Sequence, residues 1–255
     1  FITGCTEKKI SEEEAKILWK KMELFAQYGF NLSHSISYSI ISYQCAWLLN
    51  YYQAEWMAAF LEKEPEDRKE KAINIARSFG FKIDSLDINT SGVHWEIAPD
   101  GRTLIQPLTS LKGLGSKAIE QIIENRPFQK IEEFLFHENI SYSKLNKRAI
   151  DVLIRSQALN SLVDDRFVGL RHFWSAVAVD RPKTPKKFHE NIDVYKAEGD
   201  FSDEEKIEYL SSLTGVFPIE LVMSKKIKSR LEEVHVPPIS EYDKDLLVCW
   251  GIIRE

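Results

Sequence analysis

Two glycines flanked by lysines are the residues in this chain best suited to bind an anion. They lie in the run Lys112-Gly113-Leu114-Gly115-Ser116-Lys117. Ile119, Ile122 and Ile123 follow at the spacing of one helix face. Two glycines permit a tight turn with positive φ, and the amides after such a turn point outward at a helix N-terminus. Because these amides and the helix dipole favour negative charge, we expect residues 113–117 to contact one phosphate.

A second polar group precedes a long apolar stretch. Asn31 and Ser33 are favoured N-cap residues, and with His34 they would place hydrogen-bond donors beside free amides, an arrangement that suits a triphosphate. Tyr38 lies one turn further on, where its ring could flank a base. The alternative is that Asn31 or Ser33 simply caps the helix, while His34 is a surface or core-edge histidine.

The elements that must position these groups are mainly helical. Ser11 and Glu14 fit a capping box, and the apolar spacing after them predicts a helix that ends near Gly29. A second helix, expected over residues 33–61, is apolar on most sides and should be largely buried. Residues 36–54 carry no charge, but they include three Ser, two Gln and one Asn, so a helix inside a protein is favoured over a membrane span.

A small β element is expected to interrupt the helices. A third helix should stop at Gly80. Residues 93–97 then alternate in polarity, Asp100-Gly101 is a hairpin-turn signal, and residues 103–106 can pair back. Short helices should run on to about residue 162.

The last third of the chain predicts a linker, a helix and a strand. Residues 181–188 carry two prolines and four basic residues and read as the linker. Residues 202–213 should be helical, and residues 246–253 read as a strand. Because a strand cannot satisfy its backbone alone, and because the chain starts at Phe1, we expect a piece of a longer protein or a processed product.

Composition excludes some classes of protein. The 255 residues are 44% hydrophobic and 29% charged with a net charge of −5, which argues against a disordered chain and a wholly basic nucleic-acid coat. Residues 102–155 nevertheless hold nine basic and six acidic residues. That basic island fits a backbone-binding module, although ordinary solvated helix faces would also explain it.

Other side chains are expected to be structural. The three cysteines form no CxxC pair and the six histidines show no metal spacing, so neither a disulfide framework nor a metal site is suggested, and a reducing compartment is the default. Cys45 should be buried. Four tryptophans on apolar patterns should be core residues: Trp19, Trp47, Trp56 and Trp95.

Two stretches carry a family resemblance. The glycine run resembles the helix-hairpin-helix module, which grips a DNA backbone without reading sequence. The stretch around Asn31 resembles the fingers signature of bacterial replicative DNA polymerases, the DNA polymerase III alpha subunit and its relatives. The residues in register are Phe25, Ala26, Tyr28, Gly29, Phe30, Asn31, Ser33, His34, Tyr38, Ser42, Tyr43, Gln44, Ala46, Trp47, Leu48, Tyr52, Glu55, Met57, Ala58 and Ala59. The similarity continues in residues 87–91, 111–117, 125–128, 146–148, 208–210 and 247–253, and it is weak through residues 165–200.

The resemblance implies a mainly α fold with a helical fingers region, a small β-hairpin, a helix-hairpin-helix module and the start of a C-terminal OB-like β domain. The implied boundaries are as follows: fingers, 1–90; β-hairpin and helix-hairpin-helix module, 91–163; linker, 164–201; helical connector, 202–240; and the beginning of the OB-like domain, 241–255.

The resemblance also implies a function. The chain would be part of a replicative polymerase that extends a DNA primer from deoxynucleoside triphosphates in a bacterial cytoplasm, or in a host cytoplasm if it is viral. The implied partners are duplex primer-template, a deoxynucleoside triphosphate and the rest of the polymerase chain, without a membrane. Asn31, Ser33, His34 and Tyr38 would line the nucleotide side. The implied DNA-binding residues are Lys112, Gly113, Leu114, Gly115, Ser116, Lys117, Lys147 and Arg148.

No catalytic or metal-binding residue is expected in this chain. In the family, palm aspartates upstream of the fingers hold Mg²⁺ for nucleotidyl transfer. Asp84, Asp87 and Asp100 form no Asp-x-Asp pair, and the Asp164-Asp165 pair reads as a surface turn. The chain alone should therefore not catalyse.

Departures from the family pattern keep alternatives open. Leu32 replaces a lysine, which puts triphosphate contact in doubt, and Gln157 stands where a glycine often opens a second hairpin. No clamp-binding motif was found, so a sliding-clamp partner has no support here. The alternatives are a non-catalytic DNA-binding module or split-polymerase subunit that lacks nucleotide selection and, more weakly, a structural piece whose hairpin contacts nothing.

Overall fold

The structure is a computed structural model that describes residues 1–28, 31–216, 218, 225–236 and 249. It divides into two compact units, residues 1–56 and 57–255. The expected helix stop at Gly29 and the expected OB-like strand fall outside the described residues, apart from Cys249. Among the described residues, no helix combines the length and hydropathy that a membrane crossing requires.

The first unit is helical. It holds α1 (Ile2–Glu7), α2 (Glu12–Tyr28), α3 (Leu32–Tyr51) and the start of α4 (Gln53–Lys63). The predicted capping box is confirmed, since Glu14 N donates to Ser11 Oγ at 3.2 Å and Ser11 N donates to Glu14 Oε2 at 3.1 Å. The single helix expected over residues 33–61 is instead two helices, α3 and α4, which meet at Tyr52.

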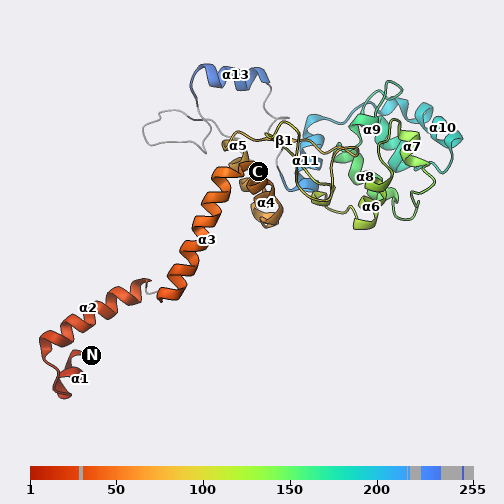
Figure 1. Ribbon diagram of the computed structural model, residues 1–255. Helices are drawn as coiled ribbons and strands as arrows, with labels where there is room; N and C mark the ends of the chain where they lie inside the picture. The colour runs from red at the N-terminus through yellow and green to blue at the C-terminus, as the bar shows by residue number, and fades with distance from the viewer. Residues whose placement is uncertain (29–30, 217, 219–224, 237–248, 250–255) are drawn as a thin grey trace. The chain divides into compact units, whose positions relative to one another are not determined.

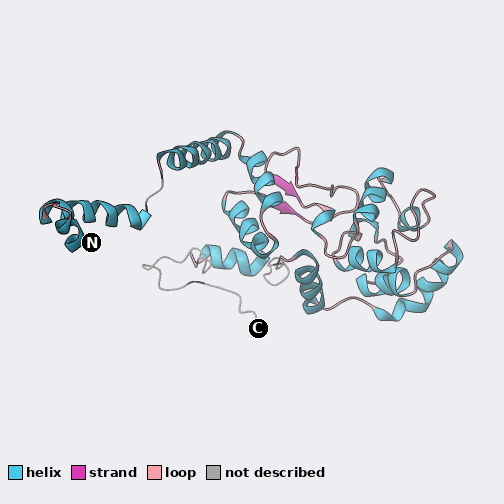
Figure 2. Ribbon diagram, turned by 90° about the horizontal axis from the view of Figure 1, so that it is seen from below, coloured by secondary structure: helices cyan, strands magenta, loops and turns pink. Residues whose placement is uncertain are grey.

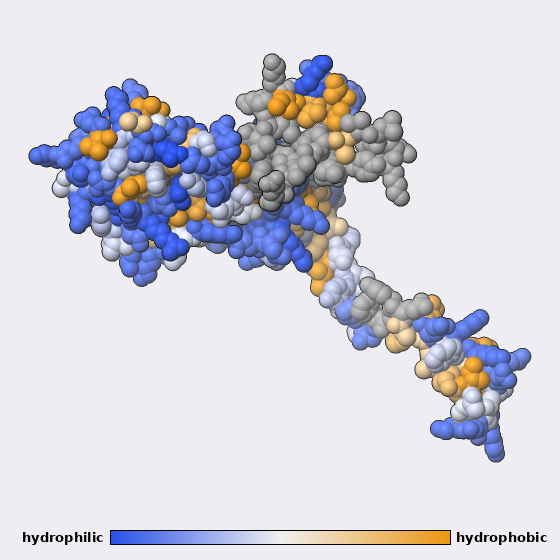
Figure 3. Space-filling view, turned by 180° about the vertical axis from the view of Figure 1, so that it is seen from behind, coloured by the Kyte–Doolittle hydropathy of each residue, from blue (hydrophilic) through white to orange (hydrophobic). Residues whose placement is uncertain are grey.

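The expected burial of the second helix is wrong for α3, which has no buried residue. Figure 3 shows hydrophobic side chains exposed along these helices. Trp19 and Trp47 are 45% and 43% exposed, whereas Trp95 of the second unit is buried as expected. Cys45 is half-buried. Apolar composition predicts that a helix will pack against another surface, but it does not show that this surface lies in the same unit as the helix.

The second unit surrounds a small sheet with helices. α5 (Lys69–Ser78) leads into β1 (Lys82–Asp84), β2 (Glu96–Ile97) and β3 (Thr103–Ile105). The predicted hairpin is confirmed because β2 pairs antiparallel with β3. β1, which the sequence pattern did not predict, lies parallel to β3 on its other side, so the order is β1-β3-β2. Figure 2 shows these strands among the helices.

The helices after the sheet share one hydrophobic core (Figure 1). They are α6 (Ser116–Asn125), α7 (Ile131–Leu135), α8 (Lys147–Arg155), α9 (Leu170–Trp174), the π-helix η4 (Ser175–Val179), α10 (Pro185–Tyr195) and α11 (Asp203–Thr214). Short 3₁₀ turns occur at η1 (Glu66–Arg68), η2 (Leu108–Ser110), η3 (Asn160–Leu162) and η5 (Lys196–Glu198), and α13 spans Lys225–Glu233. The predicted mainly helical fold with small β elements is confirmed.

The expected linker is wrong. Residues 170–179 and 185–195 form helices, and Phe173 and Phe188 are fully buried in the core that Phe128 and Phe134 also fill. The linker was predicted from two prolines that have structural roles in the core and in a helix. Pro182 is buried, and Pro185 occupies the first turn of α10, where proline is favoured. The predicted helix over residues 202–213 is confirmed as α11, which starts with a capping box between Ser202 and Glu205.

Candidate nucleic-acid interface

The glycine hairpin is built by one left-handed residue rather than two. Gly113 has φ +92°, a conformation that disfavours residues with a Cβ. Gly115 has φ −77° and is the N-cap of α6, so the positive φ that the two glycines permit is used at Gly113 and not at Gly115. The turn is closed by Leu114 N, which donates to Leu111 O at 3.3 Å. The sequence therefore forms the predicted hairpin and places α6 directly after it.

The hairpin presents a set of unpaired amides. Gly115 caps α6 without a side-chain hydrogen bond. Within the described part of the chain, the amides of Gly113, Gly115, Ser116 and Lys117 donate to no protein acceptor, while Leu114 uses its amide within the turn. Unpaired amides at the positive end of a ten-residue helix form an anion-binding geometry.

Long-range contacts hold this hairpin in place. Lys112 N donates to Leu213 O at 2.9 Å, and Gly215 ends α11 in a left-handed conformation with φ +71°. Leu111 and Leu114 are 3% and 9% exposed, so their side chains anchor the turn in the core. The hydrogen bond to Leu213 and the two buried leucines hold the turn in one conformation. Its free amides are therefore pre-organised, and they bind an anion at a smaller entropy cost than the amides of a mobile loop would.

The structure brings Arg148 of α8 beside the hairpin. A Cβ placed on Gly113 would lie 3.6 Å from Arg148 Nε and 3.6 Å from Val152 Cγ2. Lys117 and Arg148 are exposed, and neither forms an ion pair within the described residues. Lys112, by contrast, has its Nζ 3.0 Å from Glu66 Oε1, with both side chains at least half exposed. Solvent screens such a pair, so Lys112 contributes less to an anion site than Lys117 and Arg148 do.

A cavity of about 330 Å³ lies next to Arg148. Its lining residues are Lys147, Arg148, Asp151, Trp174, Ala178 and Val179. Trp174 Nε1 donates to Asp151 Oδ1 at 2.6 Å, which orients the indole. Sequence spacing gave no indication of this cavity, since α8 and η4 meet only through the fold.

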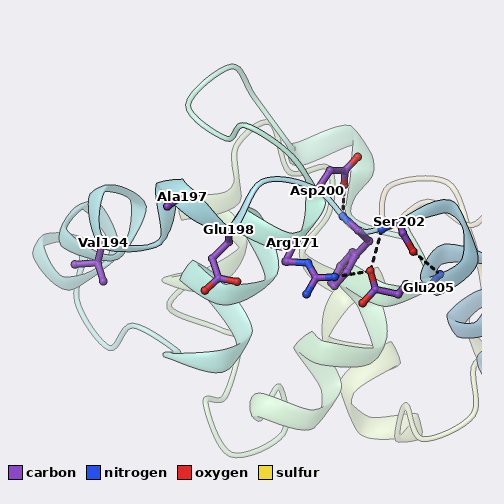
Figure 4. Close-up of a pocket in the computed structure, with 8 residues that line it drawn as sticks. Arg171, Val194, Ala197, Glu198, Asp200, Ser202 and Glu205 are labelled. Atoms are coloured by element: carbon purple, nitrogen blue, oxygen red, sulfur yellow. Dashed lines mark hydrogen bonds and ion pairs between the residues drawn. The ribbon is translucent and has the colours of Figure 1, made fainter.

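A larger cavity, of about 620 Å³, is lined by residues of α9, α10, η5 and α11 (Figure 4). Its polar groups satisfy one another. Arg171 pairs with Glu205, and Glu205 Oε2 also accepts from Ser202 N at 2.9 Å. Asp200 accepts from Leu170 N at 2.9 Å and pairs with Lys206. These contacts stabilise the start of α11 and leave no unpaired donor for a ligand among the groups named.

The four residues expected to contact a nucleotide gather at the start of α3 in the first unit. Asn31 is the N-cap, and its Oδ1 accepts from His34 N at 2.7 Å and from Ser33 Oγ at 2.8 Å. The rings of His34 and Tyr38 contact each other with centroids 4.4 Å apart and planes tilted by 37°, and Tyr38 is 61% exposed. The capping alternative therefore describes Asn31 and Ser33 well, whereas Tyr38 is exposed to solvent and His34 is half-buried.

Ionic contacts outside the hairpin have structural roles. Arg166 bridges Glu132 and Asp164 with N···O distances of 2.5 and 2.6 Å, so the Asp164-Asp165 pair is a surface turn, as the sequence suggested. The Arg166 guanidinium holds the pKa of Glu132 and of Asp164 below the usual carboxyl range. Within the described residues, no group of three or more His, Cys, Asp or Glu side chains is arranged to hold a metal.

Comparison with known proteins gives two results. A family model described as a helix-hairpin-helix motif matches residues 80–168. Proteins named DNA polymerase III subunit alpha are similar to the chain. The one from Thermus aquaticus is 35% identical over 170 residues, and the one from Pseudomonas fluorescens is 37% identical over 167; each alignment covers 64% of this chain and 14% of the relative. The Pseudomonas aeruginosa protein is 33% identical over 187 residues, covering 71% and 16%. The chain thus spans about one seventh of the relatives that it matches.

Proposed function

This chain is related to the DNA polymerase III alpha family, and we propose that its helix-hairpin-helix region holds duplex DNA by the phosphate backbone within a replicative polymerase. That polymerase would extend a DNA primer from deoxynucleoside triphosphates in the cytoplasm. The observation that carries the proposal is the group of four unpaired amides at the start of α6 beside the cations of Lys117 and Arg148.

The proposed contact is independent of DNA sequence. Amides and cations that meet a phosphate read no base edge, so the hairpin would hold any duplex and fix its register on the protein. Each phosphate neutralised by a cation releases counterions, so binding should weaken steeply with salt. A backbone clamp of this kind suits a polymerase, which must move along every sequence.

A charge reversal at the N-cap tests the proposal. Gly115→Asp would cap α6 and complement its dipole, so the fold should be retained, but the carboxylate would occupy the phosphate position. We expect its affinity for a duplex to fall at least tenfold, measured by fluorescence anisotropy over a series of salt concentrations. Gly115→Asn is the matched control because it caps the same helix end without charge, and it should lose much less affinity.

The lysine contribution has its own measurement. Lys117→Gln should lower the slope of log affinity against log salt by about 1, equally for unrelated duplex sequences. Equal affinities for the Asp and Asn variants at position 115, together with an unchanged slope for Lys117→Gln, would overturn the hairpin assignment.

We further propose that the start of α3 faces the incoming nucleotide in the full polymerase. The exposed Tyr38 ring and the half-buried His34 ring beside it support this role, whereas Asn31 and Ser33 would act mainly as the cap of the helix that carries them. In a polymerase that contains this chain, His34→Ala should raise the apparent KM for nucleotide more than it changes DNA affinity. An unchanged KM would remove His34 from the site.

Leu32 favours a second candidate, a DNA-binding module or split subunit without nucleotide selection. Its side chain is 76% exposed at the first position of α3, where a cation would otherwise meet triphosphate charge. Leu32→Lys should lower the KM for nucleotide if the site selects nucleotides and leave it unchanged if the chain only binds DNA.

The catalytic metal finds no site in the described residues. A Mg²⁺ that joins primer and triphosphate needs clustered carboxylates, and the described residues hold no group of three or more His, Cys, Asp or Glu side chains arranged to bind a metal. We therefore assign no metal-dependent step to them and expect no primer extension from this chain alone.

We also propose that the DNA-binding module extends from residue 80 to residue 214, because α9, α10 and α11 contact the elements around the hairpin.

A further inference from the structure

Two short segments concentrate positive charge in a chain that is acidic overall. Residues 142–148 contain three basic residues and residues 181–187 contain four, and neither segment contains an acidic residue. They are separated by more than thirty residues in the sequence. The second segment lies within residues 181–188, for which the prolines and basic residues predicted a linker.

The fold places these segments against each other. The guanidinium of Arg181 lies over the ring of Tyr142, 3.7 Å from its centroid, and Arg181 Nη1 donates to Tyr142 O at 3.0 Å. Lys183 Nζ is 5.9 Å from the same centroid. Cation–π contact with an aromatic ring holds a cation in place without neutralising its charge.

The 181–187 segment is held rigidly at both ends. Buried Asn191 donates from Nδ2 to Asp180 O at 2.5 Å and to Ala176 O at 2.9 Å. Thr184 caps α10 by accepting from Lys187 N at 3.3 Å, and Pro185 starts the helix. Fixed backbone on both sides pre-organises the cations between them, so an anion that binds there orders little additional chain.

Most of these cations lack a carboxylate partner. Lys187 pairs with Asp180 at 3.1 Å, but Lys144, Arg181 and Lys183 form no ion pair within the described residues. Arg181 is half-buried with its Nε unpaired, and burial lowers its pKa. Burying a guanidinium without an anion beside it costs desolvation free energy. An external anion that binds next to Arg181 would offset part of that cost.

The surface is continuous with the hairpin. The 330 Å³ cavity is bordered on one side by Lys147 and Arg148 and on the other by Val179, two residues before Arg181. Arg148 in turn lies beside the hairpin, with its Nε 3.6 Å from the position of a Cβ built on Gly113. A polyanion lying on the hairpin amides can therefore extend across Arg148 toward Tyr142.

We propose that Arg181 and Lys183, which lie beside the Tyr142 ring, and exposed Lys144, two residues along the chain from Tyr142, form a second phosphate-binding surface for the DNA backbone, which we call the Tyr142 surface. The inference rests on the proposed function of the hairpin and extends its contact to phosphates further along the DNA. This second contact would compensate for the turn at Gln157, whose amide is already used because it donates to Ile154 O at 2.9 Å.

The test removes charge from the Tyr142 surface without disturbing the ring contact of Arg181. Lys144→Gln/Lys183→Gln changes two exposed lysines in the 255-residue chain. The slope of log affinity against log salt for a duplex should fall by about 2, and affinity at 0.1 M salt should fall roughly 10- to 100-fold. The matched control is Lys71→Gln/Lys196→Gln, which removes the same charge elsewhere and should change the slope little.

Two further arms separate the outcomes. Adding Lys117→Gln to the Lys144/Lys183 variant should lower the slope of log affinity against log salt by about one more, because the effects of well-separated substitutions are additive. A single strand of the same length, measured beside the duplex, shows which form the surface prefers; stronger loss on the single strand would overturn the assignment to duplex. A slope equal to that of wild type in the Lys144/Lys183 variant, with the Lys117 effect intact, would overturn the Tyr142 surface alone. Absence of salt-dependent duplex binding by the wild-type chain would overturn both proposals.

Discussion

Asn89 forms two hydrogen bonds with the backbone of Phe128, which lies 39 residues further along the chain. Its Nδ2 donates to Phe128 O at 2.9 Å, and its Oδ1 accepts from Phe128 N at 2.8 Å. Arg126 Nη1 reinforces the junction by donating to Ser91 O at 2.9 Å. These bonds tie the segment before the hairpin to the segment after α6, so the hairpin belongs to a closed unit rather than to a free loop.

Removal of that junction should destabilise the second unit. Asn89→Ala leaves two partly buried backbone groups of Phe128 unpaired, so we expect the free energy of unfolding to fall by about 2 kcal/mol. Chemical denaturation measures it. Thr90→Ala is the neighbouring control, since Thr90 is exposed, and it should change stability by no more than about 0.5 kcal/mol. Equal stabilities for the two variants would contradict the role given to Asn89.

The two glycines of the hairpin should respond differently to alanine. Gly113→Ala has room, because its nearest contacts would be 3.6 Å away, but φ +92° strains any residue with a Cβ. We expect a loss of about 1–2 kcal/mol and weaker duplex binding, because the turn shifts the amides.

Gly115→Ala is the matched control. With φ −77° and no atom within 4 Å of a Cβ there, it should cost about 0.5 kcal/mol through a weaker N-cap. Thermal unfolding compares the pair, and a larger loss at position 115 would contradict the assignment of the left-handed conformation to Gly113.

Arg166 should make stability depend on pH. It lowers the pKa of Glu132 and Asp164, so the unfolded chain binds more protons than the folded chain near pH 4. Their stabilising contribution is therefore fully present above the unfolded carboxyl pKa of about 4 and is lost as pH falls through the lower folded values.

Arg166→Met measures this contribution. It should cost about 2 kcal/mol at pH 7 and clearly less at pH 3, where the carboxyls are increasingly protonated. Lys196→Met, at an exposed site, should show little cost at either pH. A cost for Arg166→Met that is the same at both pH values would mean that the guanidinium acts by packing on Phe167 and Phe188 alone.

Replacing Gln157 by glycine, the residue that the family pattern favours at this position, should stabilise the protein. It has φ +64°, a conformation that costs a residue with a Cβ about 1 kcal/mol. Gln157→Gly loses an exposed hydrogen bond from Asn160 Nδ2, at 3.2 Å, yet should gain about 0.5–1 kcal/mol in unfolding free energy. Gln157→Ala keeps the Cβ and should not gain, and a gain in both variants would exclude backbone strain as the cause.

Much of the local structure could be predicted because it depends on residues close in sequence. The capping box at Ser11, the β2–β3 hairpin at Asp100-Gly101 and the turn at Gly113 each follow from contacts within a few residues. The helix-hairpin-helix region could be recognised for the same reason, since its motif is one short run. The errors concerned α3 and residues 181–188, where the outcome depends on what the rest of the chain places beside a helix.

The sequence by itself determined the capping box at Ser11, the β2–β3 hairpin and the helix α11, and it pointed to a phosphate site at residues 113–117. The tertiary structure alone decided which distant residues meet: Arg148 beside Gly113, Lys112 N on Leu213 O, and Arg181 over Tyr142. The physical reason is the distance along the chain over which the interactions act. Backbone conformation and capping are settled within one turn of chain, whereas the position of a charge relative to a distant segment depends on how the whole core packs.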